Sequence, residues 1–283
     1  MILLSYGKKE NFNPPKRKEN KMKKIVTMLS MAVFAALILC GCGDNALAYV
    51  EKDAEWIVYG NTKELFKSKI WEAAEEHDLL DELAEQLKKE VGLEDLEDLD
   101  GNIAFWGSFG PKQHPVPEVD AAVLVLKKNI AKELFDAVEN KLTEKIKEEN
   151  KNAEYYRLIL ETETIDGCKA LVYKIQNKNM NTGTWGNEKI LYTIVLADKN
   201  ILQVYPEKEP SALAKPANKN NLAGMIDKNA VAAAAVCGDI VRAGLKQQLG
   251  GDAPHIGDIV LQIKADRKTL SVEGSMDISR IDD

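Results

Sequence analysis

The sequence contains few of the residues from which metal centres and nucleotide sites are built. Of its 283 residues, three are histidine and four are cysteine. The histidines, His77, His114 and His255, are isolated from one another, and no H-x-x-x-H or C-x-x-C spacing occurs. The glycine-rich phosphate loops G-x-G-x-x-G and G-x-x-x-x-G-K-[ST] are also missing. We therefore expect no metal, no cofactor and no nucleotide site of a kind that a motif reveals.

Two stretches partly match a functional motif, but each lacks a feature that the motif requires. Ser108 lies between glycines as in a nucleophile elbow, but an elbow needs a helix directly after the serine, and Pro111 follows here. The acidic run 94–101 resembles a calcium loop, yet the required spacing places Leu96 and Gly107 at ligand positions. Neither residue offers a side-chain oxygen. The sequence thus predicts no catalytic residue and no calcium site.

The charge of the chain is unevenly distributed and excludes one class of partner. The whole chain has a formal net charge of −7. Segment 1–41 holds eight Lys or Arg and two Asp or Glu, so residues 42–283 carry a net charge of about −13. A body this acidic repels phosphate backbones and anionic head groups. We expect no nucleic-acid partner, and any membrane association should depend on a lipid and not on a basic surface.

One long apolar run is present, and it follows a basic segment. Lys21, Lys23 and Lys24 precede the 15-residue stretch Ile25–Leu39. As a helix this stretch spans roughly 22 Å, whereas the hydrocarbon core of a bilayer is about 30 Å thick. A length this short is typical of the apolar region of a signal peptide. An uncleaved N-terminal membrane anchor is the alternative.

The residues that follow, Leu39-Cys40-Gly41-Cys42, resemble the lipobox of bacterial lipoproteins. The resemblance implies that a signal peptidase recognises Leu39 and Gly41 and that Cys42 carries the lipid. Cys40 is an unusual occupant of its position, and the alternative is that Cys40 is itself the acceptor. The implied location is the cell envelope, anchored by lipid to a membrane and facing the periplasm or the exterior.

Two cysteines, Cys168 and Cys237, remain outside the leader. Export would permit a disulfide between them, closing a long loop and stabilising the fold by about 4 kcal/mol in a chain-entropy account. The alternative is two separate buried thiols, because two distant cysteines carry no framework pattern.

Hydrophobic periodicity predicts an α+β fold for residues 51–205. Helices are expected from residue 62, after the N-cap Asn61, to 91, and from residue 130 to an end within the charged run 145–152. Strands are expected over 54–59, 102–109, 120–126 and 155–163. The order β-α-β-β-α-β is that of the ferredoxin-like unit, an antiparallel sheet with helices on one face. Further strands at 168–175, 189–197 and 201–205 extend the unit as a β-meander.

After a linker over 206–226, the pattern begins again. Residues 227–283 predict a partial second β-α-β-β unit, with Asp239 capping its helix and strands at 231–237, 256–265 and 270–278. Cys237-Gly-Asp there corresponds to Tyr59-Gly-Asn in the first unit. The expected organisation is therefore an N-terminal extension and signal peptide over 1–41, a tether over 42–50, and the two units joined by the linker.

The opening D-A-E-W-I-V-Y-G-N-x-x-x-L-F resembles uncharacterised exported bacterial proteins and implies no activity. Trp185, in a polar loop, is the candidate contact residue for a ligand or partner. The first hypothesis is a lipid-anchored, non-catalytic envelope module that binds a protein partner or a small ligand. The alternatives are an envelope hydrolase whose site no motif reveals, and an assembly component that pairs through an exposed strand near 271–277.

Overall fold

A computed structural model describes residues 45–276, apart from 77–83, 86–87, 90–98, 111–116, 127–129, 217–219, 250–255 and 266–269. The expected leader, with Leu39, Gly41 and Cys42, lies outside the described residues, and so do the three histidines and the acidic run from 94 to 98.

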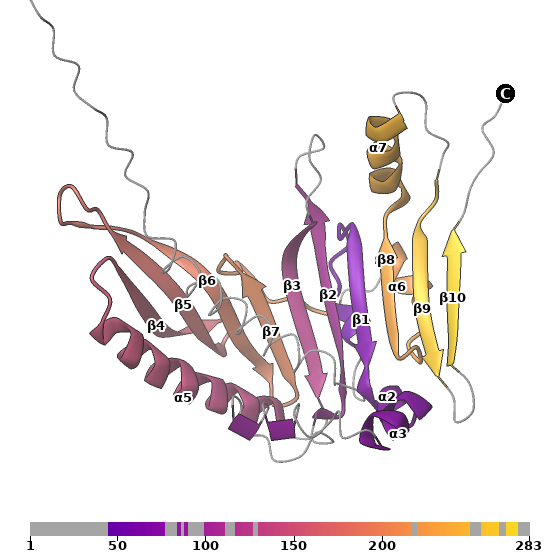
Figure 1. The fold of residues 1–283 in the computed structure, drawn as a ribbon, viewed down its shortest axis with the longest axis horizontal. Helices are drawn as coiled ribbons and strands as arrows, with labels where there is room; N and C mark the ends of the chain where they lie inside the picture. Colours follow the sequence, from indigo (N-terminus) through magenta and orange to yellow (C-terminus); the bar gives the residue numbers. More distant parts are fainter. Residues whose placement is uncertain are drawn as a thin grey trace, which may run out of the picture.

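A single antiparallel sheet of ten strands dominates the fold (Figure 1). The strands are β1 (Trp56–Asn61), β2 (Gly101–Phe109), β3 (Pro117–Leu126), β4 (Tyr156–Ile165), β5 (Cys168–Lys178), β6 (Trp185–Asp198), β7 (Ile201–Pro206), β8 (Ala232–Val236), β9 (Ile259–Ala265) and β10 (Leu270–Met276). Their spatial order is β10-β9-β8-β1-β2-β3-β7-β6-β5-β4. Each predicted strand is present, with its ends moved by a few residues, and the α+β class is confirmed.

The helices whose bounds lie within the described residues are short, with one exception. They are η1 (Ala46–Tyr49), α2 (Thr62–Phe66), α3 (Lys69–Glu76), α5 (Ile130–Lys151), α6 (Asn221–Met225) and α7 (Gly238–Leu249). Asn61 caps α2 as predicted, because its side-chain oxygen accepts the Glu64 N–H at 3.2 Å. The expected first helix is interrupted at Ser68, whose hydroxyl donates to the Leu65 carbonyl at 2.6 Å.

The strand pairing differs from the ferredoxin-like arrangement. A split β-α-β crossover joins parallel strands that another strand separates. Here β1 and β2 are direct antiparallel neighbours, and β1 pairs on its other side with β8. The order of elements was predicted correctly, but the expected neighbours were wrong, because periodicity within a strand carries no information about its partner.

Two segments expected to be simple connections belong to the core. The tether over 42–50 includes η1, in which Ala46 is fully buried, and the C-cap Val50, which is 3% exposed. The Ala46 N–H donates to the Asn102 side chain on β2 at 2.5 Å. The linker over 206–226 contains α6 and the buried Leu213 and Ala214. Both segments hold apolar side chains, whose burial offsets the cost of ordering them.

The sheet has a core on each face. One core, the α5 face, contains Phe135 and Leu134 of α5, Trp71 of α3, and the strand residues Leu171, Ile194 and Leu202. The opposite core, the η1 face, contains side chains of η1, α6 and the linker packed on Ile57, Trp106 and Tyr205. β3 contributes to both cores, because it carries apolar residues on both of its sides.

The two predicted units form one sheet. Element order β1-α2/α3-β2-β3 in the first unit corresponds to β8-α7-β9-β10 in the second. The units join where β1 and β8 pair antiparallel over five residue pairs. In Figure 1, α2 and α3 lie at one end of the strands and α7 lies at the other, as an approximate two-fold relation requires.

Candidate interaction surface

An apolar surface is exposed at the β10 end of the sheet, on the α5 face. Side chains directly opposite each other on paired strands share one face. Six successive strands, from β10 to β3, place such residues in one row: Gly274, Leu261, Ala234, Val58, Phe105 and Ala122. Ala122 is buried in the core beneath α5, whereas Val58 is 43% exposed and Leu261 is 51% exposed. The row therefore passes from a covered to an uncovered region.

Two neighbouring rows follow the same course. One consists of Ile103, Gly60, Ala232, Ile263 and Val272, and the other of Trp56, Val236, Ile259 and Met276. Ile103 is buried, while Val272 is 63% and Met276 50% exposed. We call the part of these rows that lies on β1, β8, β9 and β10 the bare face. Its exposed residues are Val58, Ala234, Leu261, Val272, Gly274 and Met276. Its half-buried residues are Trp56, Ala232, Val236, Ile259 and Ile263, and none of the eleven is charged.

The opposite side of the same strands is covered. Ile57, Ala235 and Val260 point to the η1 face and are 4% exposed or less. A strand with apolar residues on both sides normally has both faces buried. β1, β8 and β9 have this composition, but the described residues cover one of their faces. Contiguous exposed apolar surface of this kind marks an interaction site.

The two edges of the sheet are also unlike. At the β4 edge, the Asn150 side chain of α5 accepts the Leu158 N–H at 2.9 Å and donates to the Leu158 carbonyl at 2.8 Å. One amide thus occupies the backbone groups that a further strand would use. β4 also carries the charged residues Arg157, Glu161 and Glu163. These features prevent edge-to-edge pairing.

The β10 edge has no such capping side chain among the described residues, and it carries fewer charges than β4. No described strand or helix pairs with its outer side, and its register with β9 runs over seven residue pairs without a bulge. It contains no proline, and Glu273 is its single charged residue. Lys264 of β9 pairs with Glu273 at 2.9 Å and with Asp227 at 2.9 Å. The expectation of an exposed strand near 271–277 agrees with the exposure of residues 271–276.

Trp185, the residue singled out from the sequence, lies at the other end of the sheet. It opens β6 and is 39% exposed. The guanidinium of Arg157 lies 5.0 Å from the centre of the indole ring, and the Lys178 ammonium lies 5.8 Å away. The ring therefore already contacts two cations of the same chain. Arg157 is held in turn by the Gln176 side chain at 2.5 Å.

Cys168 and Cys237 are free thiols in the structure. Cys168 begins β5, Cys237 directly follows β8, and five strands lie between β5 and β8. Six strand spacings of about 4.8 Å amount to roughly 29 Å, whereas bridged cysteines have Cα atoms within about 7 Å. This arrangement contradicts the disulfide and favours separate thiols.

Cys237, and not Asp239 as expected, precedes α7. The N–H groups of Asp239 and Ile240 point at its sulfur, and Asp258 accepts the Gly238 N–H at 3.0 Å. Burial raises the pKa of the Cys237 thiol, with Asp258 and Asp239 adding to the shift. A thiol with a raised pKa is a poor nucleophile near neutral pH.

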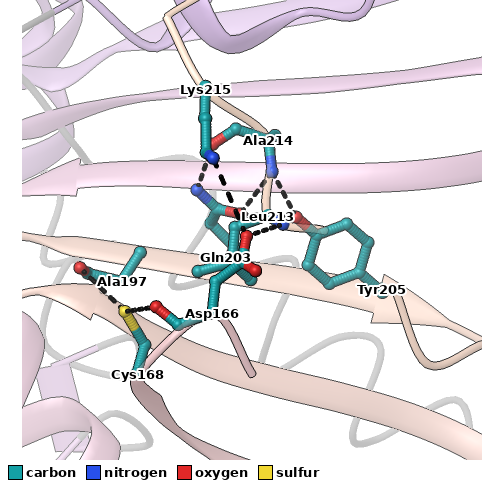
Figure 2. A network of polar contacts seen from close by, with 8 residues as sticks. All are labelled: Asp166, Cys168, Ala197, Gln203, Tyr205, Leu213, Ala214 and Lys215. Atoms are coloured by element: carbon teal, nitrogen blue, oxygen red, sulfur yellow. Dashed lines mark hydrogen bonds and ion pairs between the residues drawn. The ribbon is translucent and has the colours of Figure 1, made fainter. Parts of the chain in front are cut away.

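A polar network fixes the linker to the η1 face (Figure 2). The Gln203 amide donates to the Ala214 carbonyl at 2.8 Å, and its oxygen accepts the Ala214 N–H at 3.0 Å. The Tyr205 hydroxyl donates to Gln203 and lies 2.9 Å from the Ala214 nitrogen. Burial raises the pKa of Tyr205 to about 12. Gln203 is 1% exposed, so this network is a structural support.

The turn between β4 and β5 also contacts the linker. Asp166 and Gly167 connect β4 and β5 with positive φ values of 51° and 82°, as a two-residue hairpin turn requires. The Asp166 carboxylate accepts the Leu213 N–H at 3.1 Å and lies 3.9 Å from the Lys215 ammonium. Cys168 donates to the Ala197 carbonyl at 3.5 Å.

Across the described part of the chain, no three His, Cys, Asp or Glu side chains gather in a way that could hold a metal ion. In the same residues, no helix has the length and hydropathy needed to cross a bilayer. No known protein family, no curated protein and no solved structure matches this chain. The surface must therefore be interpreted from its own geometry.

Proposed function

We propose that this chain is a lipid-anchored protein of the bacterial cell envelope that acts as a non-catalytic interaction module. The leader sequence supports the anchor, because basic, apolar and lipobox segments follow in order up to Cys42. The bare face supports the interaction role, since exposed apolar residues of neighbouring strands, such as Val58, Leu261 and Val272, lie together there. The exposed apolar surface of the bare face is the observation on which the interaction role depends.

The partner we infer for the bare face is an amphipathic helix of an envelope protein. The same rows of side chains are covered by α5 at the other end of the sheet, so the face has the shape that accepts a helix. Within a fold, a helix and a sheet bury their apolar sides against each other. The bare face lacks charge, and we expect its partner helix to present an apolar stripe.

The position of the proposed anchor makes the membrane itself a poor occupant. Four residue steps separate Cys42 from Ala46, which is about 14 Å of extended chain. Ala46 belongs to η1, and η1 packs on the side of the sheet opposite the bare face. A lipid on Cys42 would hold the η1 face near the bilayer and turn the bare face away from it.

Two experiments test the proposal separately. For the anchor, Cys42→Ser should release the folded protein from membranes, whereas Cys40→Ser should leave it bound. Retention of the Cys42→Ser protein would show that Cys40 is the acceptor or that the leader stays attached.

For the interaction role, a photo-cross-linking residue at Leu261 should form an adduct with an envelope protein in intact cells. The same residue at Lys246, exposed on α7, is the control. Equal labelling at the two positions would contradict a binding role for the bare face.

A further inference from the structure

We propose that a second copy of this chain pairs with β10, so that two sheets join edge to edge through antiparallel β10 strands. The inference rests on the proposed interaction role, because the joined sheets combine two bare faces into one continuous surface. The two edges of the sheet differ: Asn150 blocks the β4 edge, whereas no described residue blocks the β10 edge.

The internal symmetry of the fold shows how edges of these units are completed. β3, the last strand of the first unit, pairs on its outer side with β7. β10 is the corresponding strand of the second unit, and its outer side has no partner among the described residues. The first strands of the two units, β1 and β8, pair antiparallel with each other. Pairing between like strands is therefore already used once within the chain.

The sequence of β10 is complementary to itself in one register. A two-fold axis perpendicular to the sheet keeps each face on its own side, so even positions oppose even positions. Centred on Gly274, this register places Val272 opposite Met276 of the second copy and Glu273 opposite Ser275. The exposed apolar pair meets on the bare face, and the single charge meets a hydroxyl. Centring on Glu273 would instead oppose two carboxylates, which is unfavourable.

Geometry at the centre of this register allows a direct test. A Cβ added at Gly274 would lie 3.7 Å from a Leu261 methyl and 4.0 Å from the Val260 carbonyl, which is ordinary contact. Opposed residues of an antiparallel pair have Cα atoms about 4.5–5.5 Å apart, within the range of a disulfide. Gly274→Cys should therefore cross-link to its own copy.

Ser271→Cys provides the matched control on the same exposed strand. In the proposed register it lies six residues from its own counterpart along the strand, which is roughly 20 Å. Both substitutions are made in the full-length, membrane-associated protein carrying Cys168→Ser and Cys237→Ser. Cys40 and Cys42 are then common to both variants. After mild oxidation, we expect at least about tenfold more covalent dimer from Gly274→Cys.

The strand-edge variant Val272→Lys tests the same contact without cysteine chemistry. A lysine on the edge opposes pairing, so detergent-solubilised Val272→Lys protein should sediment as a monomer while the unmodified protein sediments as a dimer. Equal cross-linking of Gly274→Cys and Ser271→Cys, or a monomeric mass for the unmodified protein, would overturn the inference. A specific adduct at Leu261 with a different protein, without selective cross-linking at Gly274, would overturn it and leave the proposed function standing.

Discussion

The two ends of the sheet are built from similar strands and differ in what covers them. At the β4–β7 end, α5 buries Phe135 and Leu134 against the strands, and Asn150 occupies the edge. At the β8–β10 end, the same face leaves Leu261 and Val272 exposed. The difference teaches that apolar strand composition specifies a face to be buried but leaves the choice of cover open. In this sheet, the chain covers the β4–β7 end of the face with its own helix, α5.

The strongest test of this comparison uses one substitution at both ends. Leu171 and Leu261 lie in the same row of the same face, yet Leu171 is fully buried and Leu261 is 51% exposed. Leu171→Ala should lower the free energy of unfolding by about 2–5 kcal/mol, because it leaves a cavity. Leu261→Ala should cost less than about 1 kcal/mol in the isolated protein. Urea denaturation measures both, and equal losses would show that the bare face is covered.

Alkaline pH should weaken the covered end specifically. Burial raises the pKa of Tyr173 and of Tyr205 to about 12, against about 10 in an unfolded chain. Between these values the unfolded chain loses its proton first, so stability is full below pH 10 and falls as pH rises, by up to about 2–3 kcal/mol for each tyrosine. Residues 226–283 contain no tyrosine.

Denaturation at pH 8 and pH 11.5 measures this loss, and Tyr205→Phe serves as the comparison. The variant lacks one of the two phenols and should lose less stability over the interval, although it is less stable at pH 8 because the Ala214 N–H loses an acceptor. An unchanged alkaline loss would contradict the assignment.

Removing the Asn150 side chain should leave the β4 edge unpaired, as the β10 edge is among the described residues. Asn150→Ala removes both hydrogen bonds to Leu158 and should cost about 1–2 kcal/mol of stability. The freed edge should also raise the tendency to aggregate, which light scattering detects. Asn152→Ala, an exposed neighbour on the same chain segment, is the control and should change neither property.

The smallest effect on stability is expected for a substitution of Trp185. Its contacts with Arg157 and Lys178 are surface cation–π interactions, so Trp185→Ala should lower stability by about 0.5–1 kcal/mol. It should leave the labelling at Leu261 unchanged, because the two residues lie at opposite ends of the sheet. A loss of partner binding would place the functional surface at the Trp185 end.

Much of the local structure was predictable from particular residues. The alternation around Val172 and Val195 predicted β5 and β6, and the apolar spacing from Ile130 onward predicted α5. The end of α5 at Lys151 lies within the charged run 145–152, where the end of this helix was expected. α6 was missed, since five residues give too short a periodic signal.

The candidate surface was less accessible to sequence reasoning. The run of alanines in β8 and the apolar residues of β9 were visible, but their pattern does not say which side is covered. Asn150 and Gln203 gave no signal, because each bonds a backbone group outside its own helix or strand, and no spacing rule predicts such a contact. The choice between a disulfide and two separate thiols could not be made from the sequence either, since the number of strands between Cys168 and Cys237 depends on the sheet order.

By itself, the sequence determined which segments are strands and helices and that two similar units follow one another, because side-chain periodicity and capping are local. Tertiary structure decided that β1 pairs with β2 and β8, that η1 and the linker enter one core, and that α5 covers one end of the sheet. These choices depend on contacts between residues far apart in the chain, each competing for the same apolar faces. The exposed face and the open β10 edge result from that competition.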